Sequence, residues 1–318
     1  MRGLAIEIGQ LKDFIVVVDA GSLTRAAVVL GLSQPAVSQR MAVLERQTGT
    51  RLLERGPRGI DPTARGLELY RHAHELVRQF DRLSESFTDG GPELSGKVSV
   101  GLPSTVAGML APELYASTAQ HHPGIHLELF ESMSGYIDEL LGRGRLDLAV
   151  LFGVGTPGRN ETLLYDEDLY LVTAAGTDPS EEPVRLVDLV GRAIVGPGSR
   201  SNLRALIDSA FSAHGLVPHV TADVESLAAM IRIAQTGRAS TILPRSVVAG
   251  YTGPPLALRL IVEPVLRRTA SIHVATRFYE PQAAVLAVRD AIVDAVHTLT
   301  DRGDWPGVRP QARPRTIA

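Results

Sequence analysis

The chain has 318 residues, of which 44% are hydrophobic and 21% are charged, and its formal net charge is -3. This length is enough for two or three domains, and no apolar run approaches the ~20 residues that a membrane-spanning helix needs. The first residues include Glu7 and Asp13 and lack the apolar core of a secretory signal, so we expect a cytoplasmic protein without a membrane partner. The absence of cysteine excludes disulfide frameworks, thiolate catalysis and cysteine zinc sites.

Positive charge is concentrated near the start of the chain. Residues 1–66 hold nine Lys and Arg against six Asp and Glu, which gives this segment a net charge of +3. Six of the nine cations lie between Arg40 and Arg65, where they could meet the phosphates of a nucleic acid. A charged surface can also serve only to keep a protein solvated, so charge alone does not identify a DNA-binding protein.

Two short helices are predicted at the start of the chain. Between residues 11 and 18, apolar side chains recur three and four positions apart, as one buried helix face requires. Gly21 ends this helix, Ser22 is a typical N-cap for the next helix, and Gly31 ends that one. Ala26 and Ala27 are small enough for another helix to cross closely at this point.

A third helix follows after a turn of only a few residues. Ser33 is its predicted cap, Pro35 lies in its first turn, where a missing amide proton costs nothing, and Gly49 ends it. Two helices joined by a short turn that contains glycine are typical of a helix-turn-helix, whose second helix enters the major groove of DNA. The residues of the third helix that we expect to point inward are Val37, Met41 and Leu44.

A basic hairpin, or wing, is predicted next. Leu52 and Leu53 form a short strand, and the turn at residues 55–59 carries two arginines. Beside a recognition helix, such a turn is well placed to reach phosphate or the minor groove. The residues predicted to contact DNA are Ser22, Thr24, Ser33, Gln34, Pro35, Ser38, Gln39, Arg40, Arg55 and Arg58.

A long helix is predicted from Thr63 to Thr88, followed by a linker at residues 89–92. One apolar stripe on this helix has alternating spacings of three and four, and a row of leucines every seven residues runs beside it. A stripe sustained over about three heptads indicates pairing with a second copy of the helix, and packing against its own domain is the alternative. The stripe consists of Tyr70, Ala73, Val77, Phe80, Ser84 and Phe87, with Leu69, Leu76 and Leu83 beside it.

From Lys97 onwards, short apolar strands alternate with helical segments, which is typical of an α/β sheet. Strands are predicted at residues 98–102, 125–130 and 146–152. In open α/β sheets, ligands bind beyond the carboxyl ends of the strands, where exposed helix amides favour anions. The candidate ligand-binding residues at these strand ends are Ser104, Thr105, Ser132, Ser134 and Phe152.

A second, similar unit begins with the strand predicted at residues 168–172. Its strand at residues 193–195 leads to another helix start, where Ser199, Arg200 and Ser201 could bind a carboxylate, because an arginine can hold it at two points. Residues 269–275 read as a strand that returns to the first unit. Two crossings between two α/β units predict a hinged cleft for a small, anionic molecule.

Three other patterns do not support a catalytic, nucleotide or metal site. Residues 153–158 fit GxGxxG, but Pro157 and the residues after it provide no helix to receive a pyrophosphate. Pro123 and Gly124 separate the histidines at positions 121, 122 and 126, so we interpret these as surface residues. No nucleophile and base occur at motif spacing, so we expect no enzyme activity and no cofactor.

The N-terminal motifs resemble the DNA-binding signature of LysR-type transcriptional regulators. The similarity departs from the family pattern at residues 53–54, where the family often has Phe and a variable residue, and at Arg65, where a small Ala is usual. The segment at residues 142–151 also matches the family, while Ala239 replaces a common glycine. Residues 69–73 and the ESMSGY segment resemble the branch with nitrogen assimilation control regulators. The matching N-terminal segments are residues 21–27, Leu30, residues 33–39, Leu44, Glu45, Gly49, Leu52, Arg55, Arg58 and Thr63.

This resemblance implies a fold and a set of partners. The expected α/β architecture is an N-terminal winged helix-turn-helix, a long linker helix and a two-lobed effector domain that is similar to periplasmic binding proteins. The implied partners are double-stranded operator DNA at promoters, a small-molecule effector, other copies of the chain in a homodimer or homotetramer, and RNA polymerase. A cytoplasmic enzyme or a solute-binding protein on the same two-lobed fold is the alternative.

The expected domain boundaries follow from these patterns. The DNA-binding domain covers residues 1–66, and the linker helix with its hinge covers residues 67–92. The effector domain covers residues 93–300, with lobe I at 97–167 and 270–300 and lobe II at 168–269. Residues 301–318 are rich in Pro and Arg, and we expect this tail to be disordered.

Overall fold

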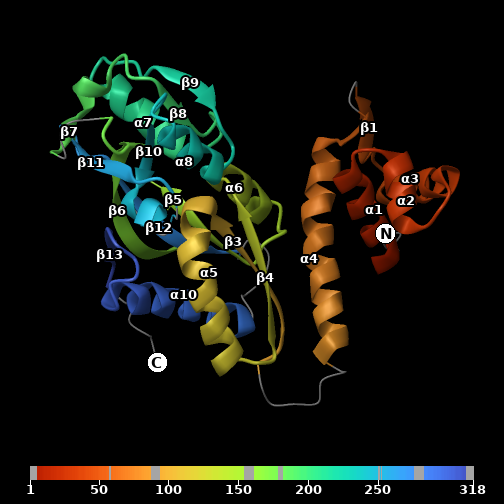
Figure 1. Cartoon of the computed structure of the whole chain (residues 1–318). Helices are drawn as coiled ribbons and strands as arrows, with labels where there is room; N and C mark the ends of the chain where they lie inside the picture. The colour runs from red at the N-terminus through yellow and green to blue at the C-terminus, as the bar shows by residue number, and fades with distance from the viewer. Residues whose placement is uncertain are drawn as a thin grey trace. The chain divides into compact units, whose positions relative to one another are not determined.

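The computed structural model describes residues 6–56, 59–86, 94–153, 161–177, 182–249, 251, 253–275 and 283–312. Side chains are described for these residues except at positions 55, 78 and 81–86. The chain divides into a first unit that holds residues 1–92 and a second unit that holds most of residues 93–318 (Figure 1). In the described ranges, no helix is both long enough and apolar enough to cross a membrane.

The first unit is a helix-turn-helix with a β-hairpin and a long helix. Its core is formed by apolar side chains of α1, α2, α3 and α4, including Phe14, Val37 and Tyr70. In chain order, its elements are α1 (Ile8–Ala20), α2 (Leu23–Leu30), α3 (Gln34–Thr48), β1 (Leu53–Gly56), β2 (Gly59–Pro62) and α4 (Ala64–Ser86).

The predicted helix ends in this unit are confirmed. The Ser22 and Ser33 side chains accept hydrogen bonds from backbone amides in the first turns of α2 and α3. Gly21, Gly31 and Gly49 follow the three helices in the left-handed conformation, which glycine adopts without steric cost. These short-range contacts fix where each helix begins and ends.

The hairpin is held against the helices by two close backbone approaches. The Ile60 N–H donates to the Gly21 carbonyl at 2.9 Å, so β2 joins the turn between α1 and α2. A Cβ atom at Gly66 would lie 1.9 Å from the Leu52 carbonyl oxygen, so only glycine allows α4 to start this close to β1. The hairpin is therefore a fixed part of the first unit.

The second unit is an α/β structure built on one long sheet. The sheet has the strand order β4-β3-β5-β12-β6-β11-β7, with β10 and β13 also paired to β6. The helices of this unit are α5 (Ser104–His121), α6 (Ser134–Gly142), α7 (Asn202–Ala213), α8 (Leu227–Gln235), α9 (Arg245–Ala249) and α10 (Ala283–Asp301), with a 3-10 helix at Leu186–Leu189. The strands are β3 (Gly96–Pro103), β4 (Ile125–Ser132), β5 (Leu148–Gly153), β6 (Glu161–Ala174), β7 (Val184–Arg185), β8 (Ile194–Gly196), β9 (Val220–Asp223), β10 (Thr241–Pro244), β11 (Leu256–Val262), β12 (Arg267–Val274) and β13 (Val308–Pro310).

Two separate hydrophobic cores give this unit its two lobes. One core joins α5 and α10 to β3, β5 and β12, and the other lies around α7, β10 and β11. The continuous strand β6 passes through both, because its first half pairs with β12 and its second half pairs with β10 and β11. The strand that returns to lobe I, predicted at residues 269–275, is β12.

The expectation of a disordered tail is wrong for residues 302–312. Trp305 is buried in the lobe I core with its ring centroid 5.0 Å from that of Tyr165. Strand β13 pairs with β6, and Arg309 forms an ion pair with Asp168 at 2.8 Å. Composition rich in Pro and Arg predicts disorder, but one large aromatic side chain and a strand edge to pair with are enough to order this segment. Residues 313–318 lie outside the described residues.

Candidate functional site

The start of α3 presents polar side chains on the surface of the first unit. Ser33, Gln34 and Gln39 are exposed and Ser38 is half-buried, whereas the inward positions Val37, Met41 and Leu44 are buried as predicted. Pro35 is exposed in the first turn of the helix, and Thr24 is exposed on α2. Half-buried Ser22 uses its side chain to cap α2. The side-chain amides of Gln34 and Gln39 are therefore accessible from the solvent.

Three arginines of this unit, Arg40, Arg55 and Arg58, differ in what the structure shows of their side chains. Arg40 is half exposed and forms an ion pair with Asp13 of α1 at 2.7 Å. The backbone of Arg55 lies in β1, while its side chain and all of Arg58 lie outside the described residues. Arg40 thus helps to fix α3 on α1 and keeps part of its guanidinium in solvent.

Helix α4 uses the first half of its predicted stripe inside its own unit. Tyr70 and Ala73 are fully buried against α1, and the Tyr70 hydroxyl donates a hydrogen bond to Asp19. Burial and this hydrogen bond raise the pKa of Tyr70. The pairing surface predicted at these two positions is therefore wrong, because they belong to the core. Phe80, later in the stripe, and Leu76 beside it are exposed.

A small cavity of about 20 Å³ lies between the two lobes of the second unit. Helices α5, α6, α7 and α8 all begin beside it. Its polar lining consists of Ser104, Thr105, Ser134, Ser201 and Arg268. Its apolar lining includes Met133, Phe152, Leu203, Leu227 and Met230. Five of the eight predicted ligand-binding residues line this cavity, namely Ser104, Thr105, Ser134, Phe152 and Ser201.

Arg268 is the cavity residue that sequence reasoning missed. It pairs across the sheet with Glu167, and the two charged groups are 2.6 Å apart, with 5% and 2% of their side chains exposed. Its Nη2 donates to Thr105 Oγ1 at 2.9 Å, and its guanidinium carbon lies 3.6 Å from the centroid of the Phe152 ring. Burial raises the pKa of Glu167, although the guanidinium beside it acts in the opposite direction.

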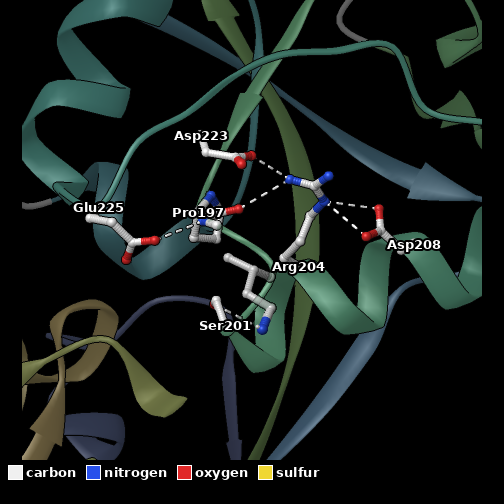
Figure 2. Close-up of polar contacts among 8 residues, drawn as sticks. Pro197, Ser201, Arg204, Asp208, Asp223 and Glu225 are labelled. Atoms are coloured by element: carbon white, nitrogen blue, oxygen red, sulfur yellow. Dashed lines mark hydrogen bonds and ion pairs between the residues drawn. The ribbon is translucent and has the colours of Figure 1, made fainter. Parts of the chain in front are cut away.

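The loop before α7 is held by a network of polar contacts (Figure 2). Arg204 donates from Nη1 to the Pro197 carbonyl at 3.3 Å and to Asp223 at 2.7 Å, and from Nε to Asp208. The N–H of Gly198 donates to Glu225 at 3.1 Å. This network fixes the loop that leads to Ser201, whose side chain caps α7.

Arg200 does not line the cavity, contrary to its predicted role. Its side chain is 79% exposed and forms an ion pair with Glu139 of α6 at 2.7 Å. Ser199 is exposed, and Ser132, half-buried at the end of β4, is also absent from the lining. The start of α7 brings backbone groups to the cavity, but the side chain of Arg200 pairs with Glu139 outside it.

Several contacts join the lobes beside the cavity. The backbone N–H of Asn202 donates to Ser134 Oγ at 3.2 Å, and its side-chain amide donates to the Phe152 carbonyl at 2.8 Å. A Cβ atom on Gly135 would lie 2.0 Å from the carbonyl oxygen of Arg200. The start of α6 in lobe I therefore lies in direct contact with the start of α7 in lobe II.

No metal site emerges in the part of the chain that the structure describes. There is no cluster of three or more His, Asp or Glu side chains among these residues that could hold a metal ion. His121 is exposed, and its Nδ1 lies 2.9 Å from the Ser117 carbonyl. Most of the GxGxxG segment, residues 154–158, lies outside the described residues.

Comparisons with known proteins cover nearly the whole chain. Residues 8–67 match the family described as "Bacterial regulatory helix-turn-helix protein, lysR family", and residues 91–296 match the "LysR substrate binding domain". The nitrogen assimilation regulatory protein nac of Escherichia coli K12 is 32% identical over 304 residues, which are 93% of this chain and 97% of that protein. This similarity agrees with the branch that the sequence motifs resemble.

Solved structures show the same fold. A full-length OxyR variant from Pseudomonas aeruginosa superposes with a TM-score of 0.67 at 20% identity, over 98% of this chain and 99% of that one. Full-length CbnR in complex with its target DNA superposes with a TM-score of 0.50 at 24% identity, over 92% and 100% of the two chains.

Proposed function

Because this chain belongs to the LysR family of bacterial helix-turn-helix regulators, we propose that it binds operator DNA as a homodimer or as a tetramer of paired dimers and that a small effector modulates its activity. It is a DNA-binding transcriptional regulator and not an enzyme. Contact with RNA polymerase at the promoter belongs to the same proposal.

The exposed start of α3 is the observation that carries this proposal. Gln34 and Gln39 are exposed there, and the Ser33 cap and the three buried side chains on the opposite face fix the helix in place. An amide side chain can read a base edge by donating and accepting at once. Operator sequence is therefore read by α3, and the cations around it bind phosphates and set the overall affinity.

The exposed flank of α4 is the proposed pairing surface. Leu76 and Phe80 leave apolar area in solvent on a helix of 23 residues, although Tyr70 and Ala73, earlier in the stripe, are buried in the unit's own core. Two such helices, one from each copy, would cover this area. Pairing would then place two α3 helices on one operator, as a two-fold symmetric site requires.

The inter-lobe cavity is the proposed effector site. It lies between two separate cores, so a molecule bound there contacts both lobes and can change their relative position. A coupling of about 1 to 3 kcal/mol between effector and DNA is typical of such regulators and would suffice for control of transcription.

The test compares two glutamines on the same helix. The operator is first located by genomic footprinting of the bound protein, and its affinity and that of random DNA are measured at a fixed salt concentration. Gln34→Ala should lower the affinity for the operator by about 10-fold and leave random DNA nearly unchanged, because one base contact is worth about 1 to 3 kcal/mol.

Gln47→Ala is the matched control. Gln47 lies at the other end of α3 and accepts a hydrogen bond from Gln10, so its removal should not change the ratio of operator to random affinity. Equal losses on both DNAs with Gln34→Ala would contradict the assignment of α3 as the reading helix. A protein that shows no preference for any chromosomal fragment would contradict the function itself.

A further inference from the structure

We propose that residues 302–311 act as a strap across the point where the two lobes of the second unit are joined, and that this strap limits the movement of one lobe relative to the other. The strap is part of the chain itself, so it acts without a ligand and goes beyond the function proposed above. Its pairing with β6, its attachment to lobe I and its contacts with lobe II each support this role.

The lobes are joined where β6 and β12 run side by side from one lobe to the other. Residues 165–168 of β6 pair with residues 267–270 of β12, and the Leu169 N–H donates to the Leu266 carbonyl at 2.8 Å. We call these two paired stretches the crossing. From residue 169 onwards, β6 pairs with β10 and β11 of lobe II. A ribbon of two strands twists more readily than a wider sheet, so the crossing alone would let the lobes turn about it.

The strap adds a third strand to this crossing. Strand β13, at residues 308–310, pairs antiparallel with residues 165–167 of β6. Since β12 pairs with the same residues of β6, β13 occupies the other edge of that strand. The contact continues at Gln311, whose N–H donates to the Leu164 carbonyl at 2.8 Å and whose side chain donates to Asp166 at 3.0 Å. Turning of the lobes about the crossing must therefore distort two ladders of hydrogen bonds instead of one.

The strap is attached to lobe I before it reaches the crossing. Trp305 and Val308 are buried, and both belong to the lobe I core. Arg302, at the start of the strap, forms an ion pair with Glu113 of α5 at 3.1 Å. Burial of an indole ring removes a large apolar area from water, so this end of the strap should stay in place when the other end is changed.

The other end of the strap contacts the lobe II side of the crossing. Both terminal nitrogens of Arg309 donate to Asp168, at 2.8 Å each, and Asp168 also accepts from Nε of Arg267 at 2.8 Å. This carboxylate is 12% exposed and joins a guanidinium of β12 to a guanidinium of the strap. A Cβ atom on Gly307 would lie 3.3 Å from Cβ of Arg245, so the strap backbone also packs against the start of α9. One short segment therefore contacts both lobes.

The experiment measures lobe movement in the full-length protein by pulsed electron paramagnetic resonance. Because the chain has no cysteine, two introduced cysteines carry spin labels at the chosen positions alone. Gln120→Cys on α5 labels lobe I and Ser212→Cys on α7 labels lobe II, and both positions are exposed. An excess of the cysteine-free protein dilutes the labelled chain within oligomers, so that the measured distances lie within one chain.

Two matched substitutions in the strap separate the crossing from the lobe I end. Arg309→Met removes the ion pair at the crossing, and Arg302→Met removes an ion pair within lobe I, with 47% and 58% of the two arginine side chains exposed. Arg309→Met should raise several-fold the fraction of molecules whose label distance lies outside the wild-type range, because two charge-assisted hydrogen bonds are lost. Arg302→Met should leave the distribution of distances unchanged.

A shortened chain without residues 308–318 removes the third strand and keeps Trp305. The fraction of molecules outside the wild-type range should rise on the order of 10-fold, because the backbone hydrogen bonds of β13 are lost together with the ion pair. Trp305 fluorescence during urea unfolding shows whether the shortened chain folds, since this side chain lies in the lobe I core. If it does not fold, Arg309→Met in the intact chain decides the result.

The outcomes separate the strap from the proposed function. A wild-type distribution of distances in Arg309→Met or in a folded shortened chain overturns the strap, and so does an equal change in Arg302→Met. If the unsubstituted protein still protects its operator in that case, the function stands. A protein whose lobes respond to Arg309→Met but which has no operator would instead contradict the function and leave the strap in place.

Discussion

Each unit contains an ion pair between an arginine and a carboxylate. The two pairs have nearly the same N–O distance but differ in solvent exposure. Arg40 and Asp13 are 2.7 Å apart, with 50% and 10% of their side chains exposed. Arg268 and Glu167 are 2.6 Å apart, with 5% and 2% exposed. Arg40 stays in contact with solvent, so at the proposed DNA-reading surface it can serve a partner directly. Charge in the cavity is balanced by the protein first, so a ligand meets an almost neutral pair.

The free energy of unfolding should show the contrast most clearly. Arg268→Met leaves Glu167 as a buried charge without a partner and should destabilise the effector unit by about 3 to 5 kcal/mol. Trp305, the only tryptophan of the chain, lies in the lobe I core, so its fluorescence during urea unfolding measures this unit. Adding Glu167→Gln should recover most of the loss, and a loss below about 1 kcal/mol in the single variant would contradict the comparison.

The same variant should regain stability as the pH falls. Burial raises the pKa of Glu167 in the native protein, and removal of Arg268 takes away the group that acts against this shift. A carboxyl group with a raised folded-state pKa binds its proton more tightly in the folded protein, so its contribution to stability is present at low pH and is lost as the pH rises through that pKa. The difference in urea midpoint between wild type and Arg268→Met should therefore shrink from pH 8 to pH 5, and a difference that grows would be inconsistent with a buried, unpaired Glu167.

Contact between the lobes provides a third test. Gly135 does not have a positive φ angle, so alanine fits its backbone, but the added Cβ would lie 2.0 Å from the Arg200 carbonyl oxygen across the cavity edge. Gly135→Ala should disfavour the joined arrangement and lower the free energy of unfolding of the effector unit by about 1 to 3 kcal/mol, followed by Trp305 fluorescence during urea unfolding. Gly108→Ala, in α5, is the control, because no atom lies within 4 Å of its added Cβ. Equal stabilities of the two variants would show that the lobes need not meet at this point.

Local signals explain why the first unit could be predicted so closely. Ser22, Ser33 and Gly49 act on residues within a few positions of themselves, so sequence alone identifies the helix ends. In the same way, Ser104 and Ser134 follow strands that end at one edge of a sheet, and the rule for strand ends was sufficient to find them.

Contacts between distant residues explain what sequence could not locate. Arg268 pairs with a carboxylate 101 positions away, and this pairing depends on the register of β12 and β6. Arg200 was assigned to the cavity because it follows a strand, but its partner Glu139 is 61 positions away. An arginine inside the apolar strand 267–274 was the signal that could have pointed to a buried pair.

The smallest effect on stability is expected at the proposed DNA-reading surface. Arg40→Met breaks an ion pair that is half in solvent, so it should cost at most about 1 kcal/mol of stability, measured by hydrogen exchange in α1 and α3. If the exposed part of Arg40 binds a phosphate, the same substitution weakens binding to operator and random DNA alike and lowers the slope of log affinity against log salt by about one. Arg46→Met, on the exposed last turn of α3, is the matched control for charge alone. A large loss of stability with an unchanged salt slope would show that Arg40, like Arg268, is fully committed to its carboxylate, and the distinction between the two pairs would then be lost.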